Sequence, residues 1–160
     1  ALIAGAVGGA ESGTIDAPIA RDPRRPTRMA LVREGRPART HYRTLARWDD
    51  ASLLEVRLET GRTHQIRVHL SSVGAPCIGD ATYGAVGGAA DPGRVWLHAH
   101  RLRLQHPGAG SEVVVESPLP PDLVASLEAL GAPLEGRVPP GAVSAASRSE
   151  EASDPPPTPS

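Results

Sequence analysis

Two neighbouring stretches, residues 39–48 and 52–59, alternate between positions that suit a buried face and charged or polar positions. An alternation with a period of two is typical of a β-strand that packs one side on a core. The acidic pair Asp49-Asp50 lies between the stretches and suits a short turn. We therefore predict a β-hairpin with one buried face. Side chains on the same face would be Thr40, Tyr42, Thr44 and Ala46 in the first strand, and Leu54, Val56 and Leu58 in the second.

The period of the apolar positions changes after residue 60, and the new spacing predicts a helix. Thr63 is a residue type that caps a helix N-terminus. Gly74 suits the left-handed conformation in which many helices end. Residues 61–63 would then form a turn from strand to helix. Apolar residues spaced i, i+4 and i+7 would face the core, namely Ile66, Leu70 and Val73.

Shorter patterns predict the remaining elements. Pro120-Pro121 suits the start of a helix, because proline lacks the N–H that a first helical turn leaves unbonded. The apolar side of that helix would contain Leu123, Leu127 and Leu130. Elsewhere we expect an irregular loop over 13–26, a short strand over 28–32, a turn-rich loop over 76–93, and a strand pair at 95–104 and 112–116. The predicted class is α+β, with a mixed, largely antiparallel sheet and flanking helices.

Composition divides the chain into two parts. Residues 1–131 mix periodic segments with turns and have the length of one domain. Residues 132–160 are rich in Pro, Ser, Ala and Glu, so we expect a disordered tail there. No apolar run is long enough to cross a membrane, and the single cysteine rules out an internal disulfide. We expect a cytoplasmic, monomeric protein.

Positive charge is concentrated in one segment. The formal net charge of the chain is −1, and all 17 basic residues other than histidine are arginine. Between residues 21 and 47 there are nine arginines and two acidic residues, a net charge of +7. Arginine pairs with phosphate in a planar, two-pronged geometry. The segment is either a solvated loop without a ligand or a surface that binds an anionic polymer.

The predicted turn from strand to helix concentrates polar side chains. Unpaired N–H groups at a helix N-terminus favour anions, and a guanidinium pairs with a carboxylate or a phosphate. Arg67 follows His64 by three residues, so the two share a helix face. The polar residues of this junction are Arg62, Thr63, His64, Gln65, Arg67 and His69.

The run TGRTHQIRVHL over residues 60–70, followed by Gly79-Asp80 and Tyr83-Gly84, resembles the hallmark pattern of the RluA-type RNA pseudouridine synthases. Other segments are similar to that family in the expected order. They are GTIDAPI at 13–19 with the arginines after it, GRPA at 35–38, LHA at 97–99, HP at 106–107, and SPLP at 117–120. The resemblance covers about residues 1 to 130 and implies a partial pseudouridine synthase catalytic fold.

The resemblance also implies a reaction. Such enzymes isomerise uridine to pseudouridine in ribosomal or transfer RNA with an aspartate nucleophile and need no metal or cofactor. Their aspartate lies in a segment HRLD-T-S-G, which is not found here, so we expect the chain to start after it and to be inactive alone. By its position in the motif, Arg67 would be the catalytic partner of that aspartate.

The same resemblance suggests which residues contact RNA. We expect structured RNA as the partner, with ribosomal RNA preferred over transfer RNA, and no membrane contact. Base extrusion, which such enzymes use, leaves flanking phosphates to be held by arginines. The expected RNA-binding residues are Arg62, Thr63, His64, Gln65 and Leu97 near the site, and Arg24, Arg25 and Arg28 for the phosphates.

Two other functions remain open from the sequence. A non-catalytic RNA-binding or structural remnant would use the same arginines and would need no nucleophile. A metal-dependent hydrolase would use histidines, of which His98 and His100 share a strand face. His64 and His69 are five residues apart and fall on different helix faces, unlike the i, i+4 pair of many zinc sites.

Overall fold

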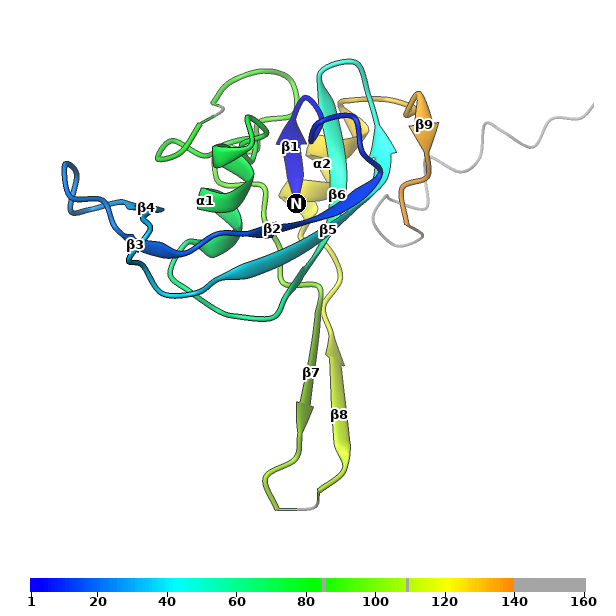
Figure 1. The fold of residues 1–160 in the computed structure, drawn as a ribbon. Helices are drawn as coiled ribbons and strands as arrows, with labels where there is room; N and C mark the ends of the chain where they lie inside the picture. Colours follow the sequence, from blue (N-terminus) through cyan, green and yellow to red (C-terminus); the bar gives the residue numbers. More distant parts are fainter. Residues whose placement is uncertain (85, 109, 140–160) are drawn as a thin grey trace, which may run out of the picture.

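The computed structural model describes residues 1–84, 86–108 and 110–139. Its main sheet is antiparallel and has the strand order β1-β6-β5-β2, with β9 paired to the far end of β5. Figure 1 shows the long β5 and β6 at its centre. The strands are β1 (Leu2–Ala4), β2 (Ser12–Asp16), β5 (Arg39–Arg47), β6 (Ala51–Leu58) and β9 (Glu135–Gly136). The predicted α+β class and the predicted hairpin are confirmed.

The sheet has a core on each side. Successive residues of a strand point to opposite faces. Leu53 packs in a cluster with Leu123 and Leu127 of α2 (Pro121–Glu128). Leu54 packs in a second cluster with Leu70 of α1 (Gln65–Ser72). The two helices therefore cover opposite faces of β6, and the expectation of a single buried face was wrong for the first half of this strand.

A β-bulge explains part of this difference. Thr44 pairs with Leu54, but Ala46 pairs with Leu53, so Leu45 is an extra residue in β5. A bulge moves the following side chains to the other face of the strand. Ala46 consequently joins the α2 cluster, although the alternation had placed it with Thr44. At the other end of β6, Leu58 is 43% exposed despite its apolar side chain.

The helix α1 departs from the prediction at its start and in one of its expected apolar positions. His64, and not Thr63, precedes the first helical residue, and it has a left-handed backbone with φ of 55° and no side-chain cap. Val73 is 41% exposed, and the buried positions are Gln65, Val68, His69 and Leu70. Gly74 has a positive φ of 76°, as predicted for the end of the helix.

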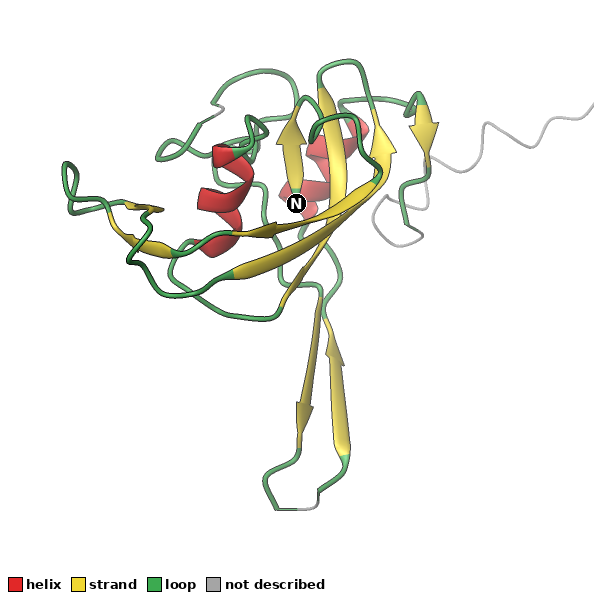
Figure 2. Cartoon of the chain, viewed as in Figure 1, coloured by secondary structure: helices red, strands yellow, loops and turns green. Residues whose placement is uncertain are grey.

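Two small ribbons extend from the body. The first joins β3 (Ile19–Arg21) to β4 (Met29–Leu31), and its intervening loop contains the first arginine cluster. The second joins β7 (Arg101–Gln105) to β8 (Glu112–Glu116) and projects away from the sheet (Figures 1 and 2). The loop expected over 13–26 thus contains β3 and most of β2, and the strand expected from residue 95 begins at Arg101.

Residues after 131 also contact the sheet. Trp48 donates its indole N–H to the carbonyl of Gly131, and Arg137 donates its backbone N–H to the carbonyl of Leu45. Val138 packs against the α2 cluster. Residues 132–139 were expected in the tail and here belong to the folded body, while 140–160 lie outside the described residues.

The single cysteine lies in the interior. Cys77 is fully buried beside Ile3, and burial raises the pKa of its thiol to about 11. A thiol in these surroundings stays protonated near neutral pH and has little reactivity. No helix in the described part of the chain is both long and apolar enough to span a bilayer.

Candidate functional site

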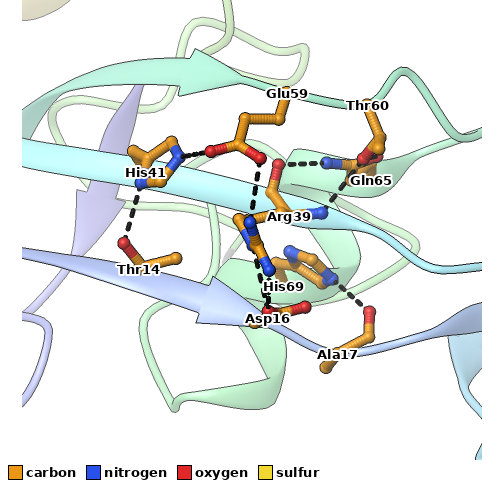
Figure 3. A network of polar contacts seen from close by, with 9 residues as sticks. All are labelled: Thr14, Asp16, Ala17, Arg39, His41, Glu59, Thr60, Gln65 and His69. Atoms are coloured by element: carbon orange, nitrogen blue, oxygen red, sulfur yellow. Dashed lines mark hydrogen bonds and ion pairs between the residues drawn. The ribbon is translucent and has the colours of Figure 1, made fainter.

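The side chain of Gln65 fixes the turn that leads into α1. Its carbonyl oxygen accepts hydrogen bonds from the Thr60 hydroxyl at 2.8 Å and the Arg62 backbone N–H at 3.0 Å. Its amide nitrogen donates to the carbonyl of Arg39 at 3.0 Å (Figure 3). It also donates to the hydroxyl of Thr40 at 3.0 Å. Gln65 is only 2% exposed, so it holds the turn from inside, although it had been expected among the RNA-binding residues.

His69 continues this network into the core. The ring is fully buried, and Nε2 lies 3.0 Å from the carbonyl oxygen of Ala17 (Figure 3). A carbonyl can only accept, so Nε2 carries the proton and Nδ1 accepts from the Thr40 hydroxyl at 2.8 Å. Burial lowers the pKa of His69, which agrees with a neutral ring. His69 therefore ties α1 to β5 and to the end of β2.

A second polar network lies on the exposed side of the same strands (Figure 3). Arg39 pairs with Asp16 at 2.7 Å and with Glu59 at 3.1 Å. His41 lies 2.6 Å from Glu59 and 2.7 Å from the hydroxyl of Thr14. These residues lie on an open strand surface outside the two recesses described below. Such exposed pairs contribute little stability each, and we assign them to the pairing of β2, β5 and β6.

The central pair of the site is Arg67 with Asp80. Arg67 donates from Nε to Oδ2 and from Nη2 to Oδ1, both at 2.8 Å. The Asp80 side chain is fully buried, whereas that of Arg67 is 17% exposed. Asp80 also accepts the backbone N–H groups of Thr82 and Tyr83 at 3.0 Å each. Arg67 is thus held between the protein interior and the surface.

Electrostatics keep both partners charged. Burial alone would raise the pKa of Asp80, but the hydrogen bonds from Arg67 and the two backbone amides outweigh it and lower that pKa. The hydrogen bond to Asp80 raises the pKa of Arg67 in turn. A buried carboxylate stays ionised when its partners compensate for lost water, as here.

Tyr83 connects this pair to the arginine-rich ribbon. Its hydroxyl accepts the backbone N–H of Met29 at 2.8 Å and lies 3.0 Å from Nδ1 of His64. The guanidinium carbons of Arg28 and Arg67 lie 4.9 and 5.0 Å from the centre of its ring. Cations near an aromatic face are attracted to it. One buried side chain thus contacts β4, α1 and the residue before the helix.

Two recesses border the β3–β4 ribbon, and Met29 lines both. The larger, of about 550 Å³, lies between the ribbon and the turn into α1. It is lined by Arg21, Arg36, Arg62, Thr63, one acidic residue, Glu34, and several uncharged residues. The smaller, of about 360 Å³, lies between the ribbon and α1 and is lined by Arg25, Arg28, Tyr83 and the acidic Asp22 among others. Arginines outnumber acidic residues in both linings, so both surfaces suit an anionic ligand.

The structure brings together most of the expected site residues. Arg62 and Thr63 line the larger recess, and Arg25 and Arg28 line the smaller one. His64 lies beside Tyr83, and burial followed by the charge of Arg67 lowers its pKa. Arg24 is exposed on the ribbon loop. Leu97 is half-buried and lines neither recess.

Two residues of the site were not expected as such. Asp80 and Tyr83 had been noted only as parts of a motif. An aspartate that accepts the N–H groups two and three residues ahead forms a recognisable turn. The sequence from Asp80 to Tyr83 therefore contained a local signal for such a turn. The pairing of Asp80 with Arg67, in contrast, depends on the tertiary fold.

The histidines proposed for a metal site are used differently. Nε2 of His98 and Nδ1 of His100 both lie within 3.0 Å of the carbonyl oxygen of Ser117. Within residues 1–84, 86–108 and 110–139, no group of three or more His, Cys, Asp or Glu is placed to hold a metal ion.

Comparison with known proteins identifies the family. A family model described as RNA pseudouridylate synthase matches residues 7–72, which include the arginine-rich ribbon and the turn into α1. The chain belongs to the RNA pseudouridine synthase family. The resemblance noted in residues 60–70 is therefore confirmed at the level of the family.

Several curated relatives of this pseudouridine synthase family match closely in sequence. An uncharacterized RNA pseudouridine synthase of Chloroflexus aurantiacus is 58% identical over 113 residues, covering 71% of this chain and 36% of that protein. Ribosomal large subunit pseudouridine synthase D of Nitrosomonas europaea is 49% identical, covering 75% and 37%. The Escherichia coli protein of the same name is 42% identical, covering 77% and 41%. The chain spans less than half the length of these relatives.

Solved structures agree on the fold. Human RNA pseudouridylate synthase domain containing 1 superimposes with a TM-score of 0.65 and 34% sequence identity, covering 79% of this chain and 56% of that one. Human RNA pseudouridylate synthase domain containing 4 gives a TM-score of 0.61 and 27% identity. These matches confirm a partial α+β fold of this family.

Proposed function

We propose that this chain is the C-terminal part of the catalytic domain of an enzyme that isomerises uridine to pseudouridine in large-subunit ribosomal RNA. The observation that supports this best is Arg67, which is fixed by a buried carboxylate and lies beside Tyr83, a residue that lines the smaller recess. Relatives at 49% and 42% identity are named ribosomal large subunit synthases, which favours ribosomal RNA over transfer RNA. We further propose a cytoplasmic monomer that uses no cofactor.

In this proposal Arg67 pairs with the nucleophilic aspartate, which lies in a segment outside these 160 residues. A carboxylate that must attack a ribose carbon has to stay ionised in a site that excludes water. An adjacent guanidinium stabilises the charged form and fixes its orientation. Asp80 does not suit the nucleophile itself, because it is enclosed and already accepts four hydrogen bonds.

RNA would lie across the two recesses. Arg25 and Arg28 on one side, and Arg62 and Thr63 on the other, would contact phosphates near the extruded base. Leu97 is proposed to contact the uracil. Gln65 is omitted from this set because its amide is fully used within the protein.

The central test compares Arg67→Ala with wild type in the full-length protein that contains this chain. We expect the rate of pseudouridine formation in large-subunit ribosomal RNA to fall by about 100-fold or more, because the nucleophile loses its charged partner. RNA affinity should stay within a few-fold, since Arg67 acts on the aspartate. A large loss of affinity with retained turnover would show that Arg67 contacts the phosphates.

The 160-residue chain provides a second comparison and distinguishes the remnant hypothesis. We expect it to bind this RNA without converting any uridine, because the nucleophile is supplied from outside. Conversion by the purified chain would contradict the location proposed for the nucleophile. A full-length protein that binds RNA and forms no pseudouridine would instead support a non-catalytic RNA-binding protein.

A further inference from the structure

The geometry of the Arg67–Asp80 pair leaves part of the guanidinium available. A guanidinium can bind a carboxylate along its Nε edge or along the edge formed by its two Nη atoms. Asp80 uses Nε and Nη2. Within the described residues, no acceptor is hydrogen bonded to Nη1, so the second edge is open there. The partial exposure of Arg67 agrees with this arrangement.

The surroundings of Asp80 make it a rigid support. Its carboxylate has no exposure to solvent and accepts four hydrogen bonds, two from Arg67 and two from backbone amides of the same loop. Gly79, immediately before it, has a positive φ of 72°, and a Cβ there would lie 2.0 Å from the carbonyl oxygen of Arg94. The Tyr83 ring lies beside the guanidinium as well. The side chain of Arg67 therefore has little freedom to rotate.

We infer that Asp80 is a positioning residue, which occupies the Nε edge of Arg67 and thereby presents the Nη edge to a second carboxylate. This inference rests on the proposed function, in which that second carboxylate is the nucleophile. Asp80 itself touches neither RNA nor the reacting atoms. Its contribution is to fix one orientation of Arg67 before the nucleophile and the uridine arrive.

Asp80→Asn in the full-length protein tests this role. The variant keeps the shape of the side chain but loses the charge that holds Arg67. We expect kcat for pseudouridine formation to fall by about 10- to 100-fold, as misplacement of a catalytic group by about 1 Å can cost that much. KM for the RNA should change by less than about threefold, because binding precedes the use of Arg67.

The double variant Asp80→Asn with Arg67→Ala separates positioning from a general structural effect. If Asp80 acts only through Arg67, the double variant should have the same kcat as Arg67→Ala alone. A kcat that falls again by the full Asp80→Asn factor would overturn the inference. An unchanged kcat in Asp80→Asn alone would overturn it too.

Asp122→Asn is a matched control, because Asp122 is also held through two nitrogens of one arginine, Arg94. That pair is exposed, and Asp122, unlike Asp80, does not hold Arg67, so kcat should not change. If Asp80→Asn fails to fold, Asp80→Glu replaces it. Glu keeps the charge but displaces the guanidinium, so a wild-type kcat in Asp80→Glu would overturn the inference.

A wild-type protein that forms no pseudouridine would contradict the proposed function itself and end this inference with it.

Discussion

At the scale of single residues, the clearest physical consequence concerns His69. The ring is neutral in the folded protein, since Nδ1 accepts from Thr40 and burial lowers its pKa below the usual 6.5. The unfolded chain binds a proton more readily at this position than the folded chain does. The contribution of His69 to the free energy of unfolding is therefore complete above about pH 6.5. It is lost as the pH falls towards the lowered pKa.

We predict that the free energy of unfolding falls between pH 7 and pH 5, by at most about 1.4 kcal/mol per pH unit from this group. His64 has a lowered pKa as well and adds in the same direction. Denaturant unfolding at several pH values measures the effect. A His69→Gln variant should show a weaker pH dependence, whereas His100→Gln on the exposed surface should match wild type. Equal pH dependence in all three proteins would contradict a neutral buried His69.

The sequence predicted which polar residues lie together at the turn into α1 better than it predicted what each of them does. Arg67 was expected to pair with an aspartate outside this chain, and that pairing stays a prediction; within the chain Arg67 pairs with a different carboxylate. The identity of that carboxylate within the chain, Asp80, depended on a loop that folds back onto α1. Gln65 was misplaced, since a polar residue at a helix start looks the same in sequence whether it faces inward or outward.

At the scale of elements, strands with a clear alternation were predicted well. The hairpin of β5 and β6 followed directly from the period of two. The bulge at Leu45 did not, because an extra residue in one strand is visible only against its partner. The strands β2 and β3 were missed since their short runs lie among prolines and arginines, and their pairing with β5 and β4 supplies the order.

Gly79 provides a test at this scale. Alanine there would be strained by the φ of 72° and would collide with the carbonyl of Arg94. We predict that Gly79→Ala destabilises the protein by about 3 kcal/mol or more, because neither backbone can move freely. Thermal or denaturant unfolding checks this. Gly61→Ala is the matched control, since no atom lies within 4 Å of its added Cβ and its φ is not positive, and a similar loss there would contradict the explanation.

At the scale of the whole molecule, the distribution of charge matters more than its sum. The net charge of −1 conceals a segment with nine arginines, and the fold places several of them around the two recesses. Other arginines are neutralised within the protein, such as Arg39 by Asp16 and Glu59. The surface that we propose for RNA is therefore smaller than the sequence suggested and is centred on the β3–β4 ribbon.

We predict that replacing Arg24, Arg25 and Arg28 by alanine weakens RNA binding and flattens its dependence on salt. Each lost phosphate contact should reduce the slope of log affinity against log salt by roughly 0.7–0.9. Binding titrations at several salt concentrations measure this slope. Arg101→Ala on the distant β7 is the control, because Arg101 already pairs with Glu116. An unchanged slope in the triple variant would exclude the ribbon as the main phosphate contact.

The enclosed thiol of Cys77 has a practical consequence for spectroscopy. It is the one cysteine of the chain, it has no solvent exposure, and its pKa of about 11 keeps it protonated. Thiol-reactive dyes would therefore leave it unmodified in the folded protein. A cysteine introduced on the β3–β4 ribbon could then be labelled selectively without removing the native one. Fluorescence from that label would report directly whether the ribbon contacts RNA.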